Sequence, residues 1–235
     1  MTFRRLSDLR FNLLRAIGKA LVPTYRFHWP QMVWWQDEEF NAYLKRFEEH
    51  DGMNSHRRWM VLQLARLVAS VPGDTAECGV YAGASSYLIC TATQTDPRRT
   101  HFLFDSFDGL SKPSTVDGTY WQKGDLRCSI EVVRSNLNGN ISFHPGWIPE
   151  RFDDVRGRRF AFVHIDVDLY QPTRDSIEFF YPRTTTGGII VCDDYGFTTC
   201  PGATKAVDDF LSDKPEKMIV LPCGGGFFIK NIATA

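Results

Sequence analysis

Two pairs of aspartates stand out because each pair follows an apolar run. Asp166 and Asp168 lie in the stretch VHIDVDLY, and Asp193 and Asp194 lie in IIVCDDYG. Buried carboxylates cost free energy unless a partner compensates their charge. Residues two apart in a strand face the same side, so we expect Asp166 and Asp168 to point together. If both runs are strands, four carboxylates meet at neighbouring strand ends and repel one another unless protons or a cation neutralise them.

Carboxylate oxygens suit hard divalent cations, so the two pairs predict a site for Mg²⁺, Ca²⁺ or Mn²⁺ rather than for zinc. A single aspartate at a strand end is commonly a helix cap. Two pairs after two apolar runs favour the cation site over two separate caps. His164 lies in the same stretch as Asp166. We expect His164 on the opposite face of the strand, as a buried histidine with satisfied hydrogen bonds rather than as a catalytic base.

A glycine-bearing turn follows an earlier strand pattern, in the stretch TAECGVYAGASS. Glu77, Gly79 and Gly83 have a spacing that lets the backbone approach a ligand, and it matches neither the dinucleotide fingerprint nor a P-loop. Asp105 ends the next strand pattern, where an acid accepts hydrogen bonds from ribose hydroxyls; a turn or helix-cap role is equally open. Together the turn and the acid suggest a nucleoside ligand without a diphosphate clamp, and S-adenosylmethionine fits that description.

Strands that alternate with helices from residue 75 onward must position these residues. Strand patterns cover 75–81, 100–107, 141–147, 159–168 and 187–196, and 217–222 with 225–230 predicts a terminal antiparallel pair. Helical patterns lie between the strands. The alternation predicts an α/β, Rossmann-like fold with a mainly parallel seven-stranded sheet and helices on both faces. Ligands of such sheets bind beyond the carboxyl ends of the strands, where the candidate residues fall.

The composition is that of an ordinary globular protein and excludes several classes. The chain has 235 residues, of which 43% are hydrophobic, and a net charge of −1, so no global field recruits nucleic acid. Six cysteines without a CxxC pair are typical of reduced thiols in a cytoplasmic protein. No apolar run approaches the roughly 20 residues that span a bilayer. The expected location is therefore the cytoplasm.

The first 52 residues differ from the rest and predict an N-terminal helical extension, 1–52, ahead of a domain spanning 53–235. Residues 1–22 have five basic side chains against one acid, with apolar residues at helical spacing. Arg10, Arg15 and Lys19 interrupt the apolar core that a signal peptide needs. Two interpretations stay open. The more ordinary one is a helix packed on the domain or on a second subunit, and the other is a helix lying on an anionic surface at the inner face of the membrane.

The motifs, taken in order, resemble those of the macrocin O-methyltransferase family, whose members methylate sugar hydroxyls in macrolide and aminocoumarin antibiotics. The similar stretches, within residues 53–230, are AECGVYAGASS, LFDSFDGL, HPGW, HIDVDLYQPTRDSIEFFYP, GGIIVCDDYG and AVDDF. The resemblance implies a class I S-adenosylmethionine-dependent methyltransferase fold, a divalent metal that is usually Mg²⁺, and a homodimer or higher oligomer. Ser111–Leu126, where the family has its lid over the acceptor, is shorter than the family pattern, so the acceptor is not implied.

The resemblance also implies roles for individual residues. Asp166, Asp193 and Asp194 match the metal ligands, and Asp168 matches a general base, with Asp166 beside it in the catalytic set. The predicted cofactor-binding positions are Glu77, Gly79, Tyr81, Gly83, Ser85, Asp105 and Ser106.

The predicted function is O-methylation of a sugar or diol hydroxyl, on a glycosylated natural product or a cell-surface glycan. A metal bound to a vicinal diol stabilises the alkoxide and aims one oxygen at the methyl, while a carboxylate accepts the proton. Two alternatives stay open: a glycosyltransferase that uses the Asp-x-Asp site, and a non-catalytic S-adenosylmethionine-binding subunit. Nucleic-acid methylation is not expected, because DVDLY stands where base methyltransferases have a proline- and aromatic-bearing motif.

Overall fold

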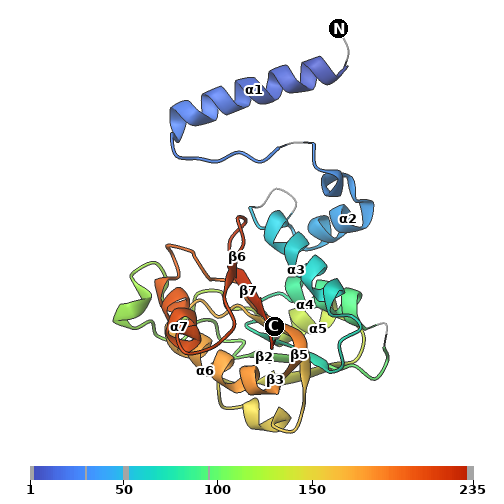
Figure 1. The fold of residues 1–235 in the computed structure, drawn as a ribbon, viewed down its shortest axis with the longest axis vertical. Coiled ribbons are helices and arrows are strands. Elements are labelled where there is room, and N and C mark those ends of the chain that lie inside the picture. The colour runs from blue at the N-terminus through green and yellow to red at the C-terminus, as the bar shows by residue number, and fades with distance from the viewer. Residues whose placement is uncertain (1–2, 30, 50–52, 95, 232–235) are drawn as a thin grey trace. The chain divides into compact units, whose positions relative to one another are not determined.

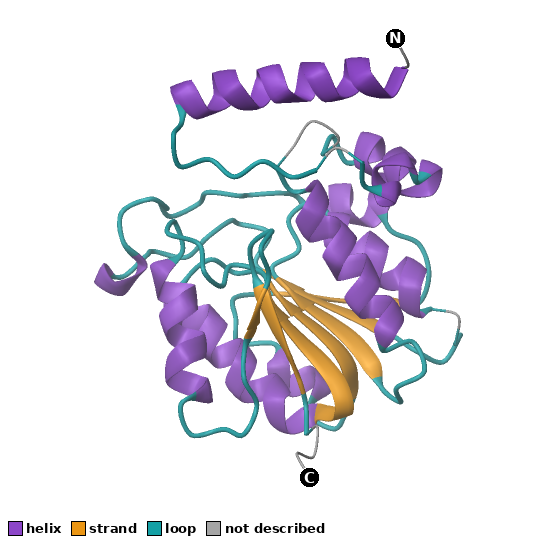
Figure 2. Ribbon diagram, turned by 45° about the horizontal axis from the view of Figure 1, so that its top comes forward, coloured by secondary structure: helices purple, strands orange, loops and turns teal. Residues whose placement is uncertain are grey.

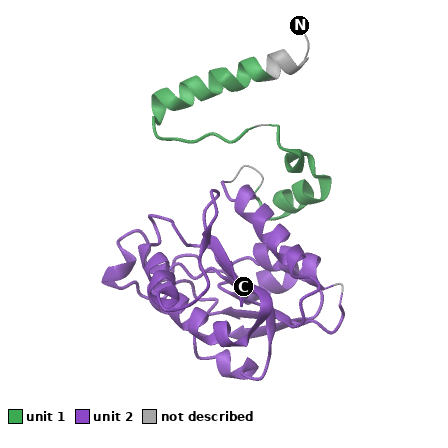
Figure 3. Cartoon of the chain, in the orientation of Figure 1, with its two compact units in different colours: residues 1–50 green, residues 51–235 purple. Residues whose placement is uncertain are grey.

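The computed structural model describes residues 3–29, 31–49, 53–94 and 96–231 (Figure 1). The chain divides into two compact units, residues 1–50 and residues 51–235 (Figure 3). The first unit contains α1 (Phe3–Leu21), the 3₁₀-helix η1 (Val33–Gln36) and α2 (Glu38–Arg46). Asp37 caps α2, since its carboxylate accepts a hydrogen bond of 2.8 Å from the Phe40 N–H.

The segment that follows α1 packs back on one side of that helix. Phe27 lies against Gly18, where the missing side chain leaves room for its ring. The ring of Trp29 lies 6.4 Å from that of Phe11, and Gln31 donates a hydrogen bond of 3.2 Å to Asp8. These contacts give the first unit its own internal packing.

A seven-stranded sheet forms the centre of the second unit (Figure 2). Its strands are β1 (Asp74–Cys78), β2 (His101–Asp105), β3 (Ile141–Pro145), β4 (Phe160–Ile165), β5 (Thr184–Cys192), β6 (Ile219–Val220) and β7 (Gly226–Ile229). The spatial order is β3-β2-β1-β4-β5-β7-β6. The first five are parallel, and β7 is antiparallel to both β5 and β6. The mainly parallel seven-stranded sheet predicted from the sequence is confirmed.

Helices cover both faces of this sheet (Figure 2). They are α3 (Ser55–Leu67), α4 (Ala84–Thr93), α5 (Ile130–Asn136), α6 (Tyr170–Phe180) and α7 (Pro201–Leu211), with short 3₁₀-helices η2 (Thr115–Asp117), η3 (Phe152–Val155) and η4 (Tyr181–Arg183). Helix α3 packs on α4, and α6 packs on α7. The α6–α7 side holds the main apolar core, which includes Phe160, Ile177 and Phe180.

The opposite face of the sheet buries polar groups beneath α4. Thr75 and Glu77 alternate along β1 with the core residues Ala76 and Cys78. His101 lies beside them on β2; its ring is fully buried, and its Nδ1 lies 2.8 Å from the Thr75 hydroxyl. This face therefore carries a buried hydrogen-bonded network that reaches toward the strand ends.

Strand β4 ends earlier than the sequence pattern indicates. The pattern predicts a strand through residue 168, but β4 stops at Ile165, and Asp168 has a φ of 58° in the left-handed region. The Asp166 N–H still donates to the Cys78 carbonyl at 2.8 Å, so the turn into α6 begins after it. Strand alternation therefore extends to Asp166 but not to Asp168, and the expectation that the two share one strand face is not met.

Candidate active site

A cavity of about 250 Å³ opens at the carboxyl ends of β1, β2 and β4. It is the location expected for ligands of a parallel α/β sheet. Its walls include six of the residues singled out from the sequence, namely Gly79, Tyr81, Asp105, Ser106, Asp166 and Asp168. Trp147, after β3, completes one side. The structure thus gathers a glycine turn, an acidic strand end and two of the four aspartates around one space.

The first acidic group consists of His164, Asp166 and Asp193, whose side-chain ligand atoms all lie within 4.8 Å of one another. Asp193 is only 2% exposed and forms an ion pair with Arg57 of α3. The Arg57 guanidinium also lies 4.9 Å from the centre of the Phe197 ring. An internal cation therefore already compensates part of the charge of this group.

The second acidic group consists of Asp168, Asp194 and Cys200, all buried and also within 4.8 Å of one another. The Asp168 N–H donates a hydrogen bond of 2.7 Å to the Asp194 carboxylate. The Cys200 thiol lies 3.5 Å from Asp168 Oδ1 and accepts a hydrogen bond of 3.3 Å from the Trp121 indole N–H. Among the described residues, no Lys or Arg forms an ion pair with Asp168 or Asp194.

Burial controls the protonation of the second group. Burial, followed by the charge of Asp166, raises the pKa of Asp168 to about 7. Burial, followed by the charge of Asp168, raises the pKa of Asp194 well above its usual range. Burial also raises the pKa of Cys200 to about 12, so this thiol stays protonated. Such shifts are the response of carboxylates that are close together, desolvated and short of a positive partner.

The glycine turn after β1 is held by contacts with both neighbouring strand ends. Gly79 has a φ of 80°, and a Cβ at this position would collide with the Asp166 carbonyl. The Asp105 carboxylate accepts hydrogen bonds of 2.7 Å and 3.2 Å from the Val80 and Tyr81 N–H groups and one of 2.7 Å from the Phe107 N–H. Asp105 therefore fixes the turn while it also lines the cavity.

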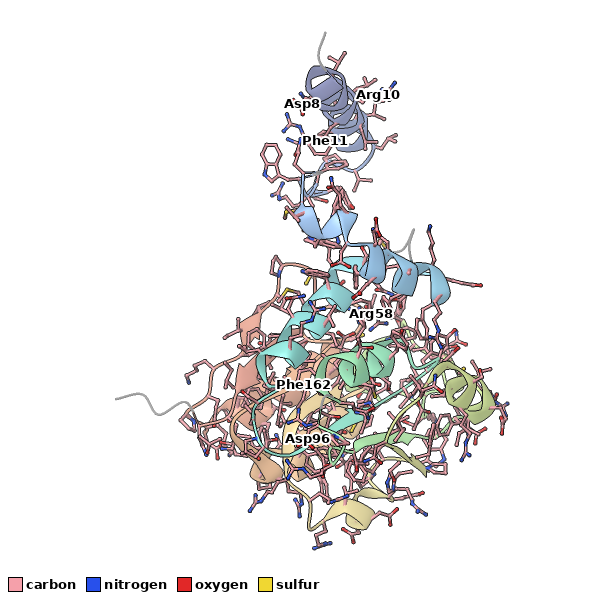
Figure 4. The ribbon with its side chains drawn as sticks, turned by 90° about the vertical axis from the view of Figure 1, so that its right-hand side faces the viewer. Asp8, Arg10, Phe11, Arg58, Asp96 and Phe162 are labelled. Atoms are coloured by element: carbon pink, nitrogen blue, oxygen red, sulfur yellow. The ribbon has the colours of Figure 1, made fainter. Side chains whose placement is uncertain are left out.

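Three predicted cofactor residues do not line the cavity. Glu77 is 1% exposed and lies beneath the site, where its carboxylate accepts a hydrogen bond from Ser86 and lies 2.8 Å from His164 Nδ1. Ser85 instead accepts a hydrogen bond of 2.6 Å from Arg58, the α3 residue labelled in Figure 4. Gly83 starts α4 with a φ of 84°. Cofactor binding by Glu77, Gly83 and Ser85 stays a prediction, and these side-chain contacts give it no support.

The sequence-based placement of His164 is wrong. His164 belongs to the same group as Asp166. It lies in β4, and Asp166 follows two residues later on the same face. Two further residues of the site, Arg57 and Cys200, were not predicted at all. Each lies outside the strand-end motifs, on α3 and immediately before α7, and tertiary packing brings it to the aspartates.

The strand order and the position of the cavity define a class I methyltransferase fold, and solved structures agree. The O-methyltransferase NovP superposes with a TM-score of 0.60 at 29% identity, covering 74% of this chain and 79% of that chain. The calicheamicin methyltransferase CalS11 superposes with a TM-score of 0.66, covering 88% and 96% of the two chains, and at 19% identity this likeness concerns the fold alone.

The family model described as macrocin-O-methyltransferase (TylF) matches residues 53–220. The chain belongs to this family, as the motifs predicted. An 8-demethyl-8-(2,3-dimethoxy-alpha-L-rhamnosyl)-tetracenomycin-C 4'-O-methyltransferase from Streptomyces olivaceus is 32% identical over 58% of each chain. The demethyldecarbamoylnovobiocin O-methyltransferase of Streptomyces niveus is 30% identical over 68% of this chain and 66% of its own length. The chain thus spans less than two thirds of the length of these relatives.

Proposed function

We propose that the protein transfers a methyl group from S-adenosylmethionine to a hydroxyl of a sugar or another vicinal diol on a glycosylated small molecule. The observation that carries this proposal is the shared wall of the cavity. Asp166 and Asp168 border the same space as the glycine turn and Asp105. A methyl donor held against the turn and a hydroxyl held by the aspartates would therefore meet, which is the arrangement that an in-line displacement needs.

The cofactor half of the cavity suits a nucleoside. The Asp105 carboxylate accepts three hydrogen bonds from backbone N–H groups. A carboxylate offers about four lone-pair sites, so an acceptor is left for a ribose hydroxyl. Gly79 brings the backbone close to the ligand, and Trp147 offers an aromatic surface on the other side. S-adenosylmethionine is the proposed occupant, since the class I fold has this cleft at the same strand ends.

The aspartates fit a hard divalent cation. Four carboxylates lie in two adjacent groups, and the raised pKa values of Asp168 and Asp194 indicate that the second group lacks positive charge. Asp166, Asp193 and Asp194 are the proposed ligands. When bound, Mg²⁺ or a similar ion would supply Lewis-acid stabilisation of the acceptor alkoxide. Arg57 must release one oxygen of Asp193 for that carboxylate to serve fully as a ligand.

Asp168 is the proposed proton acceptor. A carboxylate that borders the acceptor space can take the hydroxyl proton in the transition state. The Asp168 side chain is held by its turn conformation and by Cys200, and it lines the cavity. The Asp168 carboxylate is therefore placed where it can reach the proton of a bound hydroxyl.

The acceptor class is inferred from the relatives. The names of the two curated relatives reported above describe O-methyltransferases of the tetracenomycin and novobiocin series. A glycosylated natural product is the first candidate acceptor for this chain, and a cell-surface glycan is the second.

The test uses the full chain with S-adenosylmethionine and a panel of glycosides that carry vicinal diols, read by mass spectrometry for the gain of one methyl group. We expect product from at least one diol glycoside and none from its diol-blocked analogue. Asp168→Asn should lose turnover but still bind S-adenosylhomocysteine in calorimetry. Binding of a nucleotide sugar in place of S-adenosylhomocysteine would contradict the proposal and favour a glycosyltransferase.

A further inference from the structure

His164 has an unused nitrogen that points into the first acidic group. The ring is fully buried, and its Nε2 has no hydrogen-bond partner among the described residues. Nε2 lies 3.5 Å from Asp193 Oδ1, beyond the usual range of an N–H···O hydrogen bond. One ring nitrogen of His164 and one carboxylate oxygen each of Asp166 and Asp193 lie within 4.8 Å of one another. A buried polar atom without a partner, aimed at two carboxylates, requires an explanation.

The contact on the other side of the ring assigns the proton. His164 Nδ1 lies 2.8 Å from Glu77 Oε1. An ionised carboxylate only accepts, so we assign the ring proton to Nδ1, which donates to Glu77. With the proton on Nδ1, the Nε2 lone pair faces another acceptor, the Asp193 carboxylate. Two lone pairs so arranged are stabilised by a positive ion between them.

We propose that His164 Nε2 is a direct ligand of the divalent cation and that Glu77 is the positioning residue that orients its ring. The assignment rests on the cation site of the proposed function and adds a nitrogen to its carboxylate oxygens. A carboxylate behind a ligating imidazole is the usual way in which a metal-bound histidine is fixed in tautomer and direction. It also explains why Glu77 lies beneath the cavity instead of lining it.

A nitrogen ligand changes the preferred metal. Imidazole suits first-row transition metals such as Fe²⁺, whereas Mg²⁺ takes oxygen ligands. Mn²⁺ accepts carboxylate oxygens as Mg²⁺ does and, as a transition metal, accepts an imidazole nitrogen as well. The site should therefore bind Mn²⁺ in preference to Mg²⁺. The four aspartates alone predicted Mg²⁺, Ca²⁺ or Mn²⁺, and the family resemblance implied that the ion is usually Mg²⁺; the nitrogen ligand favours Mn²⁺ among these.

The experiment adds Mn²⁺ to the EDTA-treated full chain and records pulsed electron paramagnetic resonance spectra. We expect nitrogen hyperfine coupling from a directly bound imidazole. His164→Gln should remove this coupling and lower the ratio of Mn²⁺ to Mg²⁺ affinity by about tenfold. His144→Gln is the matched control, because His144 is a buried histidine that bonds to Asp154 and does not line the cavity; it should keep the coupling.

The outcomes separate this assignment from the proposed function. Bound Mn²⁺ without nitrogen coupling in the wild-type chain overturns the role of His164 but leaves the carboxylate site standing. No Mn²⁺ binding at all overturns the cation site, and the role of His164 with it. The wild-type spectrum needs no substitution, so the ligand assignment is tested even if His164→Gln misfolds.

An independent observation concerns α1, whose apolar side is not covered by the other described residues of its own unit. Leu9, Leu13, Leu14, Ile17 and Leu21 are each between 50% and 78% exposed. The segment after α1 contacts Asp8, Phe11 and Gly18 instead. Figure 4 shows Asp8 and Arg10 projecting to different sides of the helix. An exposed apolar stripe of this size is typical of an interaction surface.

The charge of α1 indicates the partner. Its 19 residues include five basic side chains and one acid, whereas the whole chain has a net charge of −1, so the remainder of the chain is acidic. Arg10, Arg15 and Lys19 form no ion pair with any described residue. No helix of the described residues is long and apolar enough to cross a membrane. We infer that α1 lies on the surface of an anionic lipid bilayer, with its leucines inserted and its basic groups near the phosphates.

Vesicle flotation of the full chain tests this second inference. We expect binding to vesicles that contain phosphatidylglycerol and phosphatidylcholine, and little to phosphatidylcholine alone. Leu13→Glu with Ile17→Glu should reduce binding by about tenfold or more. Asn12→Glu with Ala16→Glu adds the same charge to two exposed positions that replace none of the five apolar side chains named above, and it should reduce binding less.

Equal loss in the two double variants would overturn the inserted apolar face. So would the absence of any binding to phosphatidylglycerol vesicles. Light scattering in solution tests the other possible partner of this face, a second copy of the chain. If the wild type is a dimer that binds no vesicles, and only Leu13→Glu with Ile17→Glu makes it a monomer, the face is a subunit interface.

Discussion

The two acidic groups of the site contain similar residues but handle their charge in opposite ways. In the first group, Arg57 pairs with Asp193 and His164 lies beside it. In the second group, the Asp194 carboxylate accepts a hydrogen bond from the Asp168 N–H, and the Cys200 thiol lies beside Asp168. The pKa values of both aspartates are raised. The fold therefore supplies a positive partner, Arg57, to the first group, whereas protons or a metal ion must neutralise the second.

The largest expected effect is on cation binding, to which both groups contribute. Asp193→Asn and Asp194→Asn should each lower Mn²⁺ affinity on the order of 100-fold, because each removes an anionic ligand. Calorimetric titration of the EDTA-treated chain measures this. Asp153→Asn, whose side chain is 72% exposed away from the cavity, is the control and should bind normally. Unchanged affinity in either site variant would remove that group from the cation site.

The second effect is on stability and should have opposite signs in the two groups. Without cation, Asp194→Asn should stabilise the fold by about 1–2 kcal/mol near neutral pH, because Asn keeps an acceptor for the Asp168 N–H but needs no proton on folding, whereas the raised pKa of Asp194 requires one. Asp193→Asn should destabilise it by about 2 kcal/mol, because Arg57 loses its partner. Urea unfolding in EDTA measures both free energies. A shift of the same sign in both variants would contradict the contrast between the groups.

The third effect is a pH dependence that originates in the second group. The pKa of Asp168 in the folded, cation-free chain is about 7, above the roughly 3.9 of an unfolded aspartate. The stability contributed by its proton is therefore complete below about pH 4 and is lost as the pH rises through 7. Cation affinity should run the other way and fall by up to about tenfold per pH unit below 7, since protons compete. Asp168→Asn should flatten the stability profile measured by urea unfolding across this pH range. It should flatten the calorimetric affinity profile only in part, because Asp194 also has a raised pKa and remains.

The smallest effect tests the internal cation of the first group. Arg57→Gln should raise Mn²⁺ affinity by about fivefold, because the metal no longer competes with a guanidinium for Asp193. Arg57→Lys keeps a positive charge near the carboxylate and should change the affinity less. Calorimetry under identical salt conditions compares the two. Weaker binding in Arg57→Gln would mean that Arg57 supports the metal-bound form instead.

Much of the fold was predictable because its signals are local. Five strand patterns with intervening helices specified the parallel sheet, and the four aspartates were visible from their type and their position after apolar runs. The end of β4 was not predictable, since the pattern of alternation continues into a turn where Asp168 adopts a positive φ. The division of the aspartates into two groups depends on that turn.

The surroundings of the aspartates depend on packing and were therefore missed. Arg57 comes from α3, and Cys200 precedes α7; neither belongs to a strand-end motif. Glu77 was expected at the cofactor because it precedes a glycine turn, but its side chain faces α4 and meets His164. The spacing of two between His164 and Asp166 was the available signal for their shared face.

The central claim is that the strand-end aspartates bind one divalent cation beside the methyl donor. A crystal structure of the full chain with Mn²⁺ and S-adenosylhomocysteine, phased to reveal anomalous scattering from manganese, tests it most directly. We expect one anomalous peak between Asp166, Asp193 and Asp194, with Arg57 moved away from Asp193. No peak at saturating Mn²⁺, with the Arg57–Asp193 ion pair intact, would contradict it.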